Sequence, residues 1–427
     1  MIDRELMGTS NGTQQKGVRV ALLGNMNNNH FAMARFLRDR GVDADLLLFD
    51  HEFEHFHPSA DTYELTYRHY TRQLSWGSST RFLATSRTRV REDLAPYDVL
   101  IGCGFAPAYC EKAGRTMDIF VPYGADIWTE TAFRFISPQK LPSYWAAVFY
   151  QRRGIRRSAV IHMALSNEMY ERQYARYKGR SERWLEGIPM VHSPTYAPEE
   201  LAAFADRTHW AGEFRALRQQ NDLMVVYHAR HYWTCSATDA NAKGTDKLLR
   251  GWALFRKNHP DLRAVLVTLE YGKDVTQSKA LIDELGISHS VAWLPRMLRK
   301  DIMVGLNLAD IICGEFENSW ATSGVLYEAL ALGKPILAWR DDAYHRAREA
   351  SLYPILNANT PEEIAGRLEE FLSDPEMCRR AGRQGRQWYE EHVVNQAIGR
   401  YLAFFRDRSA RACARAVDSE KSLNAKQ

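Results

Sequence analysis

The sequence predicts an α/β protein with two domains, each built on a doubly wound parallel sheet. The 427 residues are enough for two such domains with separate cores. An apolar run over 18–23, a turn, an expected helix over 31–40 and a second apolar run over 45–49 form a βαβ opening. A second series of alternating strands and helices begins at Leu223 and continues to about residue 338.

The composition excludes several classes of protein. Hydrophobic residues make up 45% and charged residues 25% of the chain, as in ordinary globular proteins. A net charge of +4 is too mild for a nucleic-acid binder, but it is compatible with phosphorylated ligands. The loop over 24–30 is not G-x-G-x-x-G, which disfavours a dehydrogenase.

The distribution of cysteines and apolar residues predicts a cytoplasmic protein. Six cysteines show no C-x-x-C spacing, which favours reduced, structural thiols. No window holds 18 uncharged apolar residues, so we expect no transmembrane helix. Residues 1–16 are polar, lack the apolar core of a signal peptide, and are expected to be disordered.

The segment over 309–339 carries the clearest local signals. A short apolar strand is followed by a polar loop, and Ser323 is a good N-cap for a helix over Gly324–Leu332. Gly333 suits a left-handed C-terminal cap, and Pro335 stops the helix before the next strand. A helix N-terminus at the end of a parallel strand can hold an anion.

Glu328 lies one turn into this expected helix, beside its apolar stripe rather than opposite it. A carboxylate in that position should have a partner, and the hydroxyls of a ribose are one candidate. Alternatively, Glu328 flanks the core face and reaches water. Spacing alone leaves the two interpretations open.

The run over 324–336 resembles the nucleotide-sugar-binding segment of retaining glycosyltransferases of family 4 (group 1). The resemblance implies a GT-B fold, in which two Rossmann-like domains face each other across a cleft and a C-terminal helix crosses back to the first domain. The family signature is Glu, seven residues and a second Glu. Glu328 matches the second Glu, whereas Trp320 stands at the first position, where Glu317 or Glu315 could serve instead.

The resemblance also implies roles in the second domain. Arg230 and Lys243 would grip the diphosphate, because fixed cations stabilise the charge that builds on a departing nucleoside diphosphate. Glu328 would bind the ribose, and the backbone around Arg296 and Met297 would contact the base. The remaining donor-side candidates come from the loop and helix start near Glu328, namely Glu317, Trp320, Thr322, Ser323, Gly324 and Val325.

In the first domain, the loops that follow its strands are expected to face the acceptor. Asn25, Asn27 and His30 lie in the first such loop. Tyr123-Gly124-Ala125-Asp126 resembles a Tyr-Gly-x-Asp element that points into the cleft in this fold. Asp126 is therefore a catalytic candidate on the acceptor side, and its alternative role is to cap a helix from Ile127.

Two further stretches have a chemical and a simpler interpretation. His51, His55 and His57 could belong to a metal site, but a solvated loop is favoured, and family 4 enzymes need no bound metal. Aromatic residues alternate with Arg and Lys over 133–157. A packed surface helix is favoured there, and a peripheral contact with the inner membrane face is the alternative.

These observations predict a glycosyltransferase that moves a sugar from a nucleotide-diphosphate sugar, with UDP favoured over GDP, and needs no cofactor or metal. The acceptor would be a hydroxyl of a glycan, a lipid-linked glycan or a small molecule, and the family implies retention. The alternatives are a nucleotide-sugar epimerase of the same fold and a nucleotide-sugar-binding protein without catalysis.

The expected domain organisation follows the chain. The acceptor domain covers 17–195, a linker 196–222, the nucleotide-sugar domain 223–375 and the crossover helix 376–405. Charged and Ala/Ser-rich residues over 406–427 predict a flexible tail.

Overall fold

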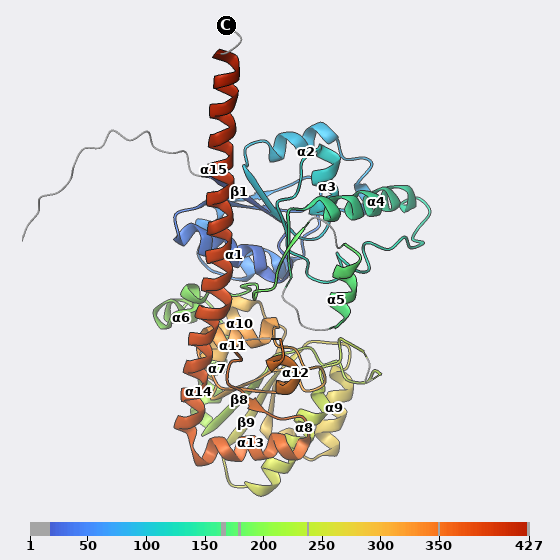
Figure 1. Cartoon of the computed structure of the whole chain (residues 1–427). Helices are drawn as coiled ribbons and strands as arrows, with labels where there is room; N and C mark the ends of the chain where they lie inside the picture. Colours follow the sequence, from blue (N-terminus) through green and yellow to red (C-terminus); the bar gives the residue numbers. More distant parts are fainter. Residues whose placement is uncertain (1–17, 164–167, 178–180, 237–238, 349–350, 425–427) are drawn as a thin grey trace, which may run out of the picture.

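Two parallel sheets, one in each half of the chain, form the frame of the protein (Figure 1). The structure is a computed structural model and describes residues 18–163, 168–177, 181–236, 239–348 and 351–424. The strand orders are β3-β2-β1-β4-β5-β6-β7 and β10-β9-β8-β11-β12-β13, and all described strand pairs are parallel. This arrangement confirms the predicted α/β fold with two doubly wound domains.

The first sheet has a fully buried centre and polar edges. Leu22 of β1 pairs with Leu46 of β2 and Ile101 of β4. Its strands are β1 (Arg19–Leu23), β2 (Asp43–Leu48), β3 (Thr71–Gln73), β4 (Val99–Gly102), β5 (Ile119–Phe120), β6 (Val160–His162) and β7 (Glu182–Trp184). Its helices are α1 (Asn29–Asp39), α2 (Arg87–Leu94), α3 (Ala106–Ala113), α4 (Leu141–Arg157) and α5 (Glu168–Ala175).

The second sheet is covered on both faces. Val225 of β8 packs in one apolar cluster and its neighbours Met224 and Val226 in another, as the period-2 alternation of a strand requires. The strands are β8 (Leu223–Tyr227), β9 (Ala264–Glu270), β10 (Val291–Pro295), β11 (Ile311–Cys313), β12 (Ile336–Ala338) and β13 (Leu356–Asn357). The helices are α8 (Thr245–Asn258), α9 (Val275–Glu284), α10 (Arg299–Leu308), α11 (Gly324–Leu332), α12 (Asp342–Arg346) and α13 (Pro361–Ser373).

The expected linker and tail both contain regular helix. The linker region holds α6 (Pro198–Ala205) and α7 (Ala211–Gln220). Helix α15 (Gln396–Asn424) runs through the region that was expected to be a flexible tail, as far as Asn424. The residues over 400–424 include neither Gly nor Pro and many helix formers, which explains its helical state. Residues 1–17 and 425–427 lie outside the described residues.

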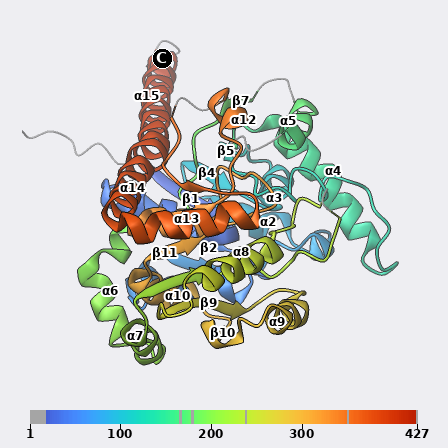
Figure 2. The ribbon, with the colours of Figure 1, turned by 90° about the horizontal axis from the view of Figure 1, so that it is seen from below.

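A continuous helical path leads from the second domain back along the first, as Figure 1 shows in red. It consists of α14 (Pro375–Trp388), a π-helical segment η8 (Tyr389–Asn395) and α15. Tyr401 of α15 bonds the ring of His162 at 2.8 Å, and Arg400 pairs with Glu182 at 2.9 Å. Seen from below, α14 and α15 lie at one side of the molecule (Figure 2). The C-terminal helix therefore crosses back onto the first domain, as predicted.

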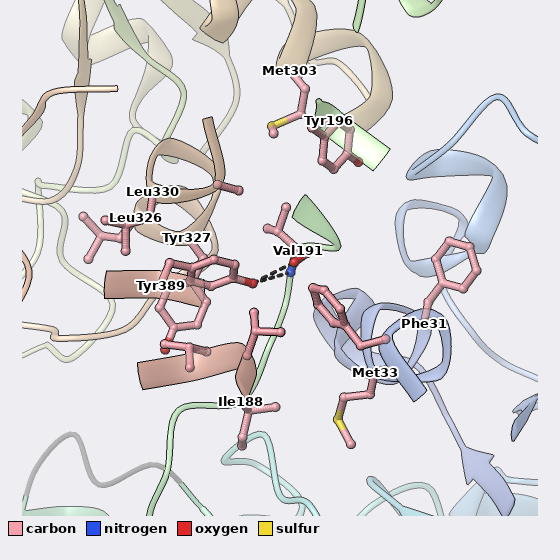
Figure 3. Packing of buried hydrophobic residues seen from close by; sticks show 14 of the residues in the cluster. Phe31, Met33, Ile188, Val191, Tyr196, Met303, Leu326, Tyr327, Leu330 and Tyr389 are labelled. Carbon is pink, nitrogen blue, oxygen red and sulfur yellow. Dashed lines mark hydrogen bonds between the residues drawn. The ribbon is translucent and has the colours of Figure 1, made fainter. Parts of the chain in front are cut away.

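The two domains share one apolar cluster where the chain passes from one to the other (Figure 3). Val191 lies in its centre, between α1 of the first domain and α11 of the second. The hydroxyl of Tyr389 donates to the carbonyl of Val191 at 2.7 Å and accepts from its N–H at 3.3 Å. Both backbone groups are thereby satisfied away from water.

The described residues bear on two expectations from the sequence, one about the cysteines and one about membrane-spanning helices. The five cysteines with described side chains are free. Across the described stretches, the structure holds no helix with the length and apolar character needed to cross a membrane.

Tyr389→Phe tests the contact at Val191. The variant leaves a buried N–H and a buried C=O without their partner, so we expect a loss of about 1–3 kcal/mol in the free energy of unfolding. Urea denaturation of the full chain measures it. Tyr70→Phe is the control, because the Tyr70 hydroxyl has no hydrogen bond within the described residues. Equal stability of the two variants would contradict the assignment.

Candidate functional site

The candidate site lies where the loops after β8 and β11 run side by side. The N–H of Phe316 donates to the carbonyl of Lys243 at 2.9 Å, and the Asn318 amide donates to the carbonyl of Ala242 at 2.9 Å. Gly244 has a φ of +64°, and a Cβ there would lie 2.9 Å from the backbone nitrogen of Glu317. The close approach of the two loops therefore requires glycine. Loops at the carboxyl ends of parallel strands form ligand crevices in this class of sheet.

Helix α11 begins and ends as predicted. The hydroxyl of Ser323 accepts the N–H of Leu326 at 3.4 Å, and Gly333 adopts a φ of 66° at the C-terminal cap. The residues from Thr322 to Val325 are partly exposed, so the N-terminal end of the helix is accessible. It offers backbone N–H groups and a partial positive charge to an anion.

Glu328 is only 7% exposed and uses both carboxylate oxygens. One lies 2.6 Å from Nε2 of His228, and the other accepts from Nε of Arg299 at 2.6 Å. Burial raises the pKa of Glu328, but Arg299 and His228 outweigh burial and hold the pKa below its ordinary value. Glu328 is therefore a buried, charged group and not a residue that reaches water.

Sequence analysis did not find His228 or Arg299. His228 follows β8 directly, two residues before Arg230, and Arg299 is the first residue of α10. The position of His228 at the end of a buried strand was a usable signal. Arg299 gave none, because nothing in its local sequence separates it from the other basic residues.

Lys243 of the β8 loop and Lys247 of α8 each contact a glutamate of the β11 loop. Lys243 contacts Glu315 at 2.6 Å, and both are buried. Lys247 contacts Glu317 at 2.9 Å, and this pair is partly exposed. Trp320, at the first signature position, is partly exposed. Both acids proposed for the missing signature Glu are thus paired with lysines, one from the β8 loop and one from the start of α8.

The other donor-side candidates line the same edge of the sheet. Arg230 is exposed and makes no hydrogen bond or ion pair with the described residues. Arg296 is exposed, with its guanidinium 5.0 Å from the centre of the Tyr271 ring, and Met297 is partly buried. Within the described residues, Arg230 is therefore a cation without a partner near the end of β8.

The first loop of the N-terminal domain is held together by its own side chains. Asn25 is fully buried, and its side chain bonds Asn28 at 3.0 Å and the N–H of Phe31 at 2.8 Å. His30 is buried and lies 2.8 Å from the carbonyl of Gly24, and burial lowers its pKa to about 4. Of the three acceptor-side candidates in this loop, Asn27 alone is exposed.

Asp126 is fully buried beneath the loop that holds Tyr123. Its carboxylate accepts the N–H groups of Tyr123 and Gly124 at 3.1 Å each and of Gly104 at 2.9 Å. The expected helix from Ile127 is absent, because this stretch forms turns, and Asp126 ties two loops together instead. Burial and the nearby Glu130 raise the pKa of Asp126.

Glu130 is a further acidic side chain beside this loop. The hydroxyl of Tyr123 lies 3.3 Å from both of its carboxylate oxygens. Glu130 is partly exposed, and burial raises its pKa. Tyr123 and Glu130 therefore lie closer to solvent than Asp126 does, although the sequence motif drew attention to Asp126.

The histidine-rich stretch does not form a metal cluster. Residues 54–56 and 58–60 are two short 3₁₀ helices, η2 (Glu54–Phe56) and η3 (Pro58–Ala60). In the described part of the chain no group of three or more His, Cys, Asp or Glu side chains could hold a metal ion.

Comparison with known proteins fits this geometry. The family described as "Glycosyl transferases group 1" matches residues 230–388, which include the β8 and β11 loops and Glu328. The match of residues 230–388 to this family indicates a glycosyltransferase with the GT-B fold. A search of curated proteins gave no match.

Solved structures support the fold over nearly the whole chain. Anabaena HepE in complex with UDP-glucose is 15% identical, with a TM-score of 0.55, over 90% of this chain and 99% of that one. Sucrose-phosphate synthase from Thermosynechococcus elongatus is 12% identical, with a TM-score of 0.56, over 92% and 100%. A putative UDP-N-acetylglucosamine 2-epimerase from Listeria monocytogenes is 12% identical, with a TM-score of 0.52, over 91% and 95%.

The buried carboxylates predict an acid-sensitive structure. Glu328 and Asp61, which also contacts Arg299, have pKa values below their ordinary 4.5 and 3.8. Their contribution to stability is therefore complete above those values and is lost as the pH falls through the lower folded values. We expect Asp61→Asn to be less stable than wild type at neutral pH, but to lose less melting temperature between about pH 6 and about pH 3. Thermal melts across this range measure it, and parallel curves would contradict it.

Proposed function

We propose that this glycosyltransferase transfers a sugar from a UDP-sugar to a hydroxyl group, with retention of configuration. The observation that carries the proposal is the grouping of basic side chains, an accessible helix N-terminus and a buried carboxylate along the β8 and β11 loops. The structural similarity to Anabaena HepE, which was solved with UDP-glucose, supports UDP as the nucleotide.

The diphosphate would lie between the β8 loop and the start of α11. Arg230 pairs with none of the residues that the structure describes, so its guanidinium is available to bind phosphate oxygens. Lys243 donates one of its three ammonium protons to Glu315, which leaves two for the ligand. The N–H groups from Ser323 to Val325 complete the anion site, and the backbone at Arg296 and Met297 contacts the base.

The placement of the diphosphate also sets the expected positions of the ribose and of the transferred sugar. Glu328 accepts the ribose hydroxyls, since a carboxylate has more lone pairs than its two present contacts use. Glu317 and Trp320 then lie on the side of the transferred sugar. As negative charge grows on the departing diphosphate, Arg230, Lys243 and the helix N-terminus stabilise it.

The acceptor would enter from the first domain. The leaving phosphate takes the proton of the acceptor hydroxyl, so no separate base is needed. Asn27 and Tyr123 face the acceptor, and Asn25, His30 and Asp126 support them by fixing their loops. The acceptor is a hydroxyl of a glycan, a lipid-linked glycan or a small molecule.

Arg230→Ala tests the diphosphate site without disturbing the fold. Because Arg230 is exposed and has no partner in the described part of the chain, the variant should keep the wild-type melting temperature and lose about 10²–10³-fold in turnover. Transfer from a radiolabelled UDP-sugar to an acceptor panel measures it. Arg250→Ala is the control, since Arg250 is also exposed, has no partner in the described residues and lies on α8. Near-normal turnover of Arg230→Ala would overturn the assignment.

The epimerase is the second candidate, because a putative 2-epimerase shares the fold. Incubation of the labelled UDP-sugar without acceptor separates the two. A glycosyltransferase leaves the sugar configuration of the donor unchanged, whereas an epimerase converts it. Binding of UDP-sugars with neither conversion nor transfer would favour a non-catalytic protein.

A lipid-linked acceptor is favoured by the surface around α4. Residues 133–157 contain six Lys or Arg and no Asp or Glu. Phe135 is 86% exposed and packs edge-on against Trp145, with ring centres 5.8 Å apart. The exposed large apolar side chains of this segment are Phe133, Phe135, Trp145 and Phe149. Exposed aromatics with basic neighbours fit an anionic membrane surface.

The double substitution Phe135→Ser and Phe149→Ser tests this contact. Each exposed aromatic that leaves the lipid should cost about 1.5 kcal/mol or more, so we expect at least a tenfold loss of binding to phosphatidylglycerol vesicles. Vesicle sedimentation measures it. Phe53→Ser is the control, because Phe53 is as exposed but lies outside the segment. Equal binding of all three proteins would exclude membrane contact through α4.

A further inference from the structure

The guanidinium of Arg299 connects the two domains next to Glu328, the carboxylate proposed to bind the ribose. Arg299 donates from Nε to Glu328 at 2.6 Å and from Nη1 to Asp61 of the first domain at 2.8 Å. Nη1 also donates to the carbonyl of Met190 at 3.0 Å. Nη2 lies 3.5 Å from the carbonyl of Asn27, to which it also donates. Arg299 therefore contacts Glu328 in its own domain and three positions outside it with a single rigid, planar group.

Asp61 is anchored firmly within the first domain. Its side chain is 0% exposed and also pairs with Arg35 of α1. Its backbone carbonyl accepts the hydroxyl of Tyr196 at 2.6 Å, and Arg35 in turn donates to Thr195 at 2.7 Å. The position of Asp61 is thus fixed by several contacts that do not involve Arg299.

The result is a chain of ion pairs and hydrogen bonds through a buried region. It runs from Arg35 to Asp61, Arg299, Glu328 and finally His228. All five side chains are buried or nearly so. A buried charge that loses one partner is strongly destabilised, so each member constrains the next. The orientation of Glu328 therefore depends on a residue of the other domain.

We propose that Asp61 and Arg299 are positioning residues that hold Glu328 in the orientation and charge state required to bind the ribose of the donor. The proposal rests on the proposed function, in which Glu328 accepts the ribose hydroxyls. A carboxylate that is already oriented loses less conformational entropy on binding than one that is free to rotate. Recognition of the ribose would then require the first domain, although the nucleotide lies in the second.

A simple structural link between the domains is the competing explanation, and the structure offers a matched control for it. The hydroxyl of Tyr63, two residues after Asp61, donates to Asp301, two residues after Arg299. This bond joins the same two segments but does not involve Glu328. Tyr63→Phe removes it and leaves the chain of ion pairs and hydrogen bonds intact.

The experiment compares the affinities of UDP and 2′,3′-dideoxy-UDP by isothermal titration calorimetry. The quantity of interest is the affinity ratio, the affinity for UDP divided by that for 2′,3′-dideoxy-UDP. In the wild type this ratio should be about ten to one hundred, the range for hydrogen bonds to a charged group. Glu328→Gln should reduce this ratio to near one. Asp61→Asn and Arg299→Lys should each reduce it at least threefold, and Tyr63→Phe should keep it.

The outcomes separate the two proposals. If Glu328→Gln keeps the wild-type ratio, Glu328 does not bind ribose and the donor assignment fails. If Glu328→Gln loses the ratio but Asp61→Asn and Arg299→Lys keep it, the positioning role alone is overturned. A loss that Tyr63→Phe shares would also overturn it, in favour of a general domain link. Arg299→Lys keeps the charge, so it decides the question if Asp61→Asn does not fold.

Discussion

A carboxylate that is buried one turn into α11 must be paired, and much of the cleft is arranged around that requirement. Taking an unpaired charge out of water costs several kcal/mol, so Glu328 is stable only with cationic or hydrogen-bonding partners close by. His228 supplies one partner from the end of β8, and Arg299 supplies the other from the start of α10. Arg299 in turn needs Asp61, which belongs to the first domain. The pairing of Glu328 in the second domain thus depends, through Arg299, on Asp61 in the first domain.

The same physical rule explains the loops beside Glu328. Lys243 and Glu315 are buried together, and Lys247 and Glu317 are paired nearby, so the loops after β8 and β11 hold each other in place. Arg230 at the same edge is left exposed. In the proposed site, lysines fixed by internal pairs and one exposed arginine would together stabilise the anionic leaving group.

Apolar packing sets the frame in which these charges meet. The cluster around Val191 includes side chains from both domains, and the helical path through η8 and α15 returns to the first domain (Figure 3). In the first domain, the buried side chains of Asn25, His30 and Asp126 make hydrogen bonds to loop residues. They therefore fix the shape of the loops instead of facing solvent. Asn27, Tyr123 and Glu130 are exposed or partly exposed, so they are the residues that the proposed acceptor could contact there.

The sequence by itself determined the fold class, the order of the main strands and helix α11 with both caps, because the spacing of apolar residues and the chemistry of helix ends are local. It missed β3 and β7, since short polar strands at a sheet edge carry no apolar run. It also gave no expectation of the helix over 406–424, where most residues favour helix. The partners of Glu328 were decided only by the tertiary structure: His228 lies 100 residues from Glu328, and Asp61 lies 238 residues from Arg299. No spacing rule connects such positions, because only the packing of the two domains brings them together.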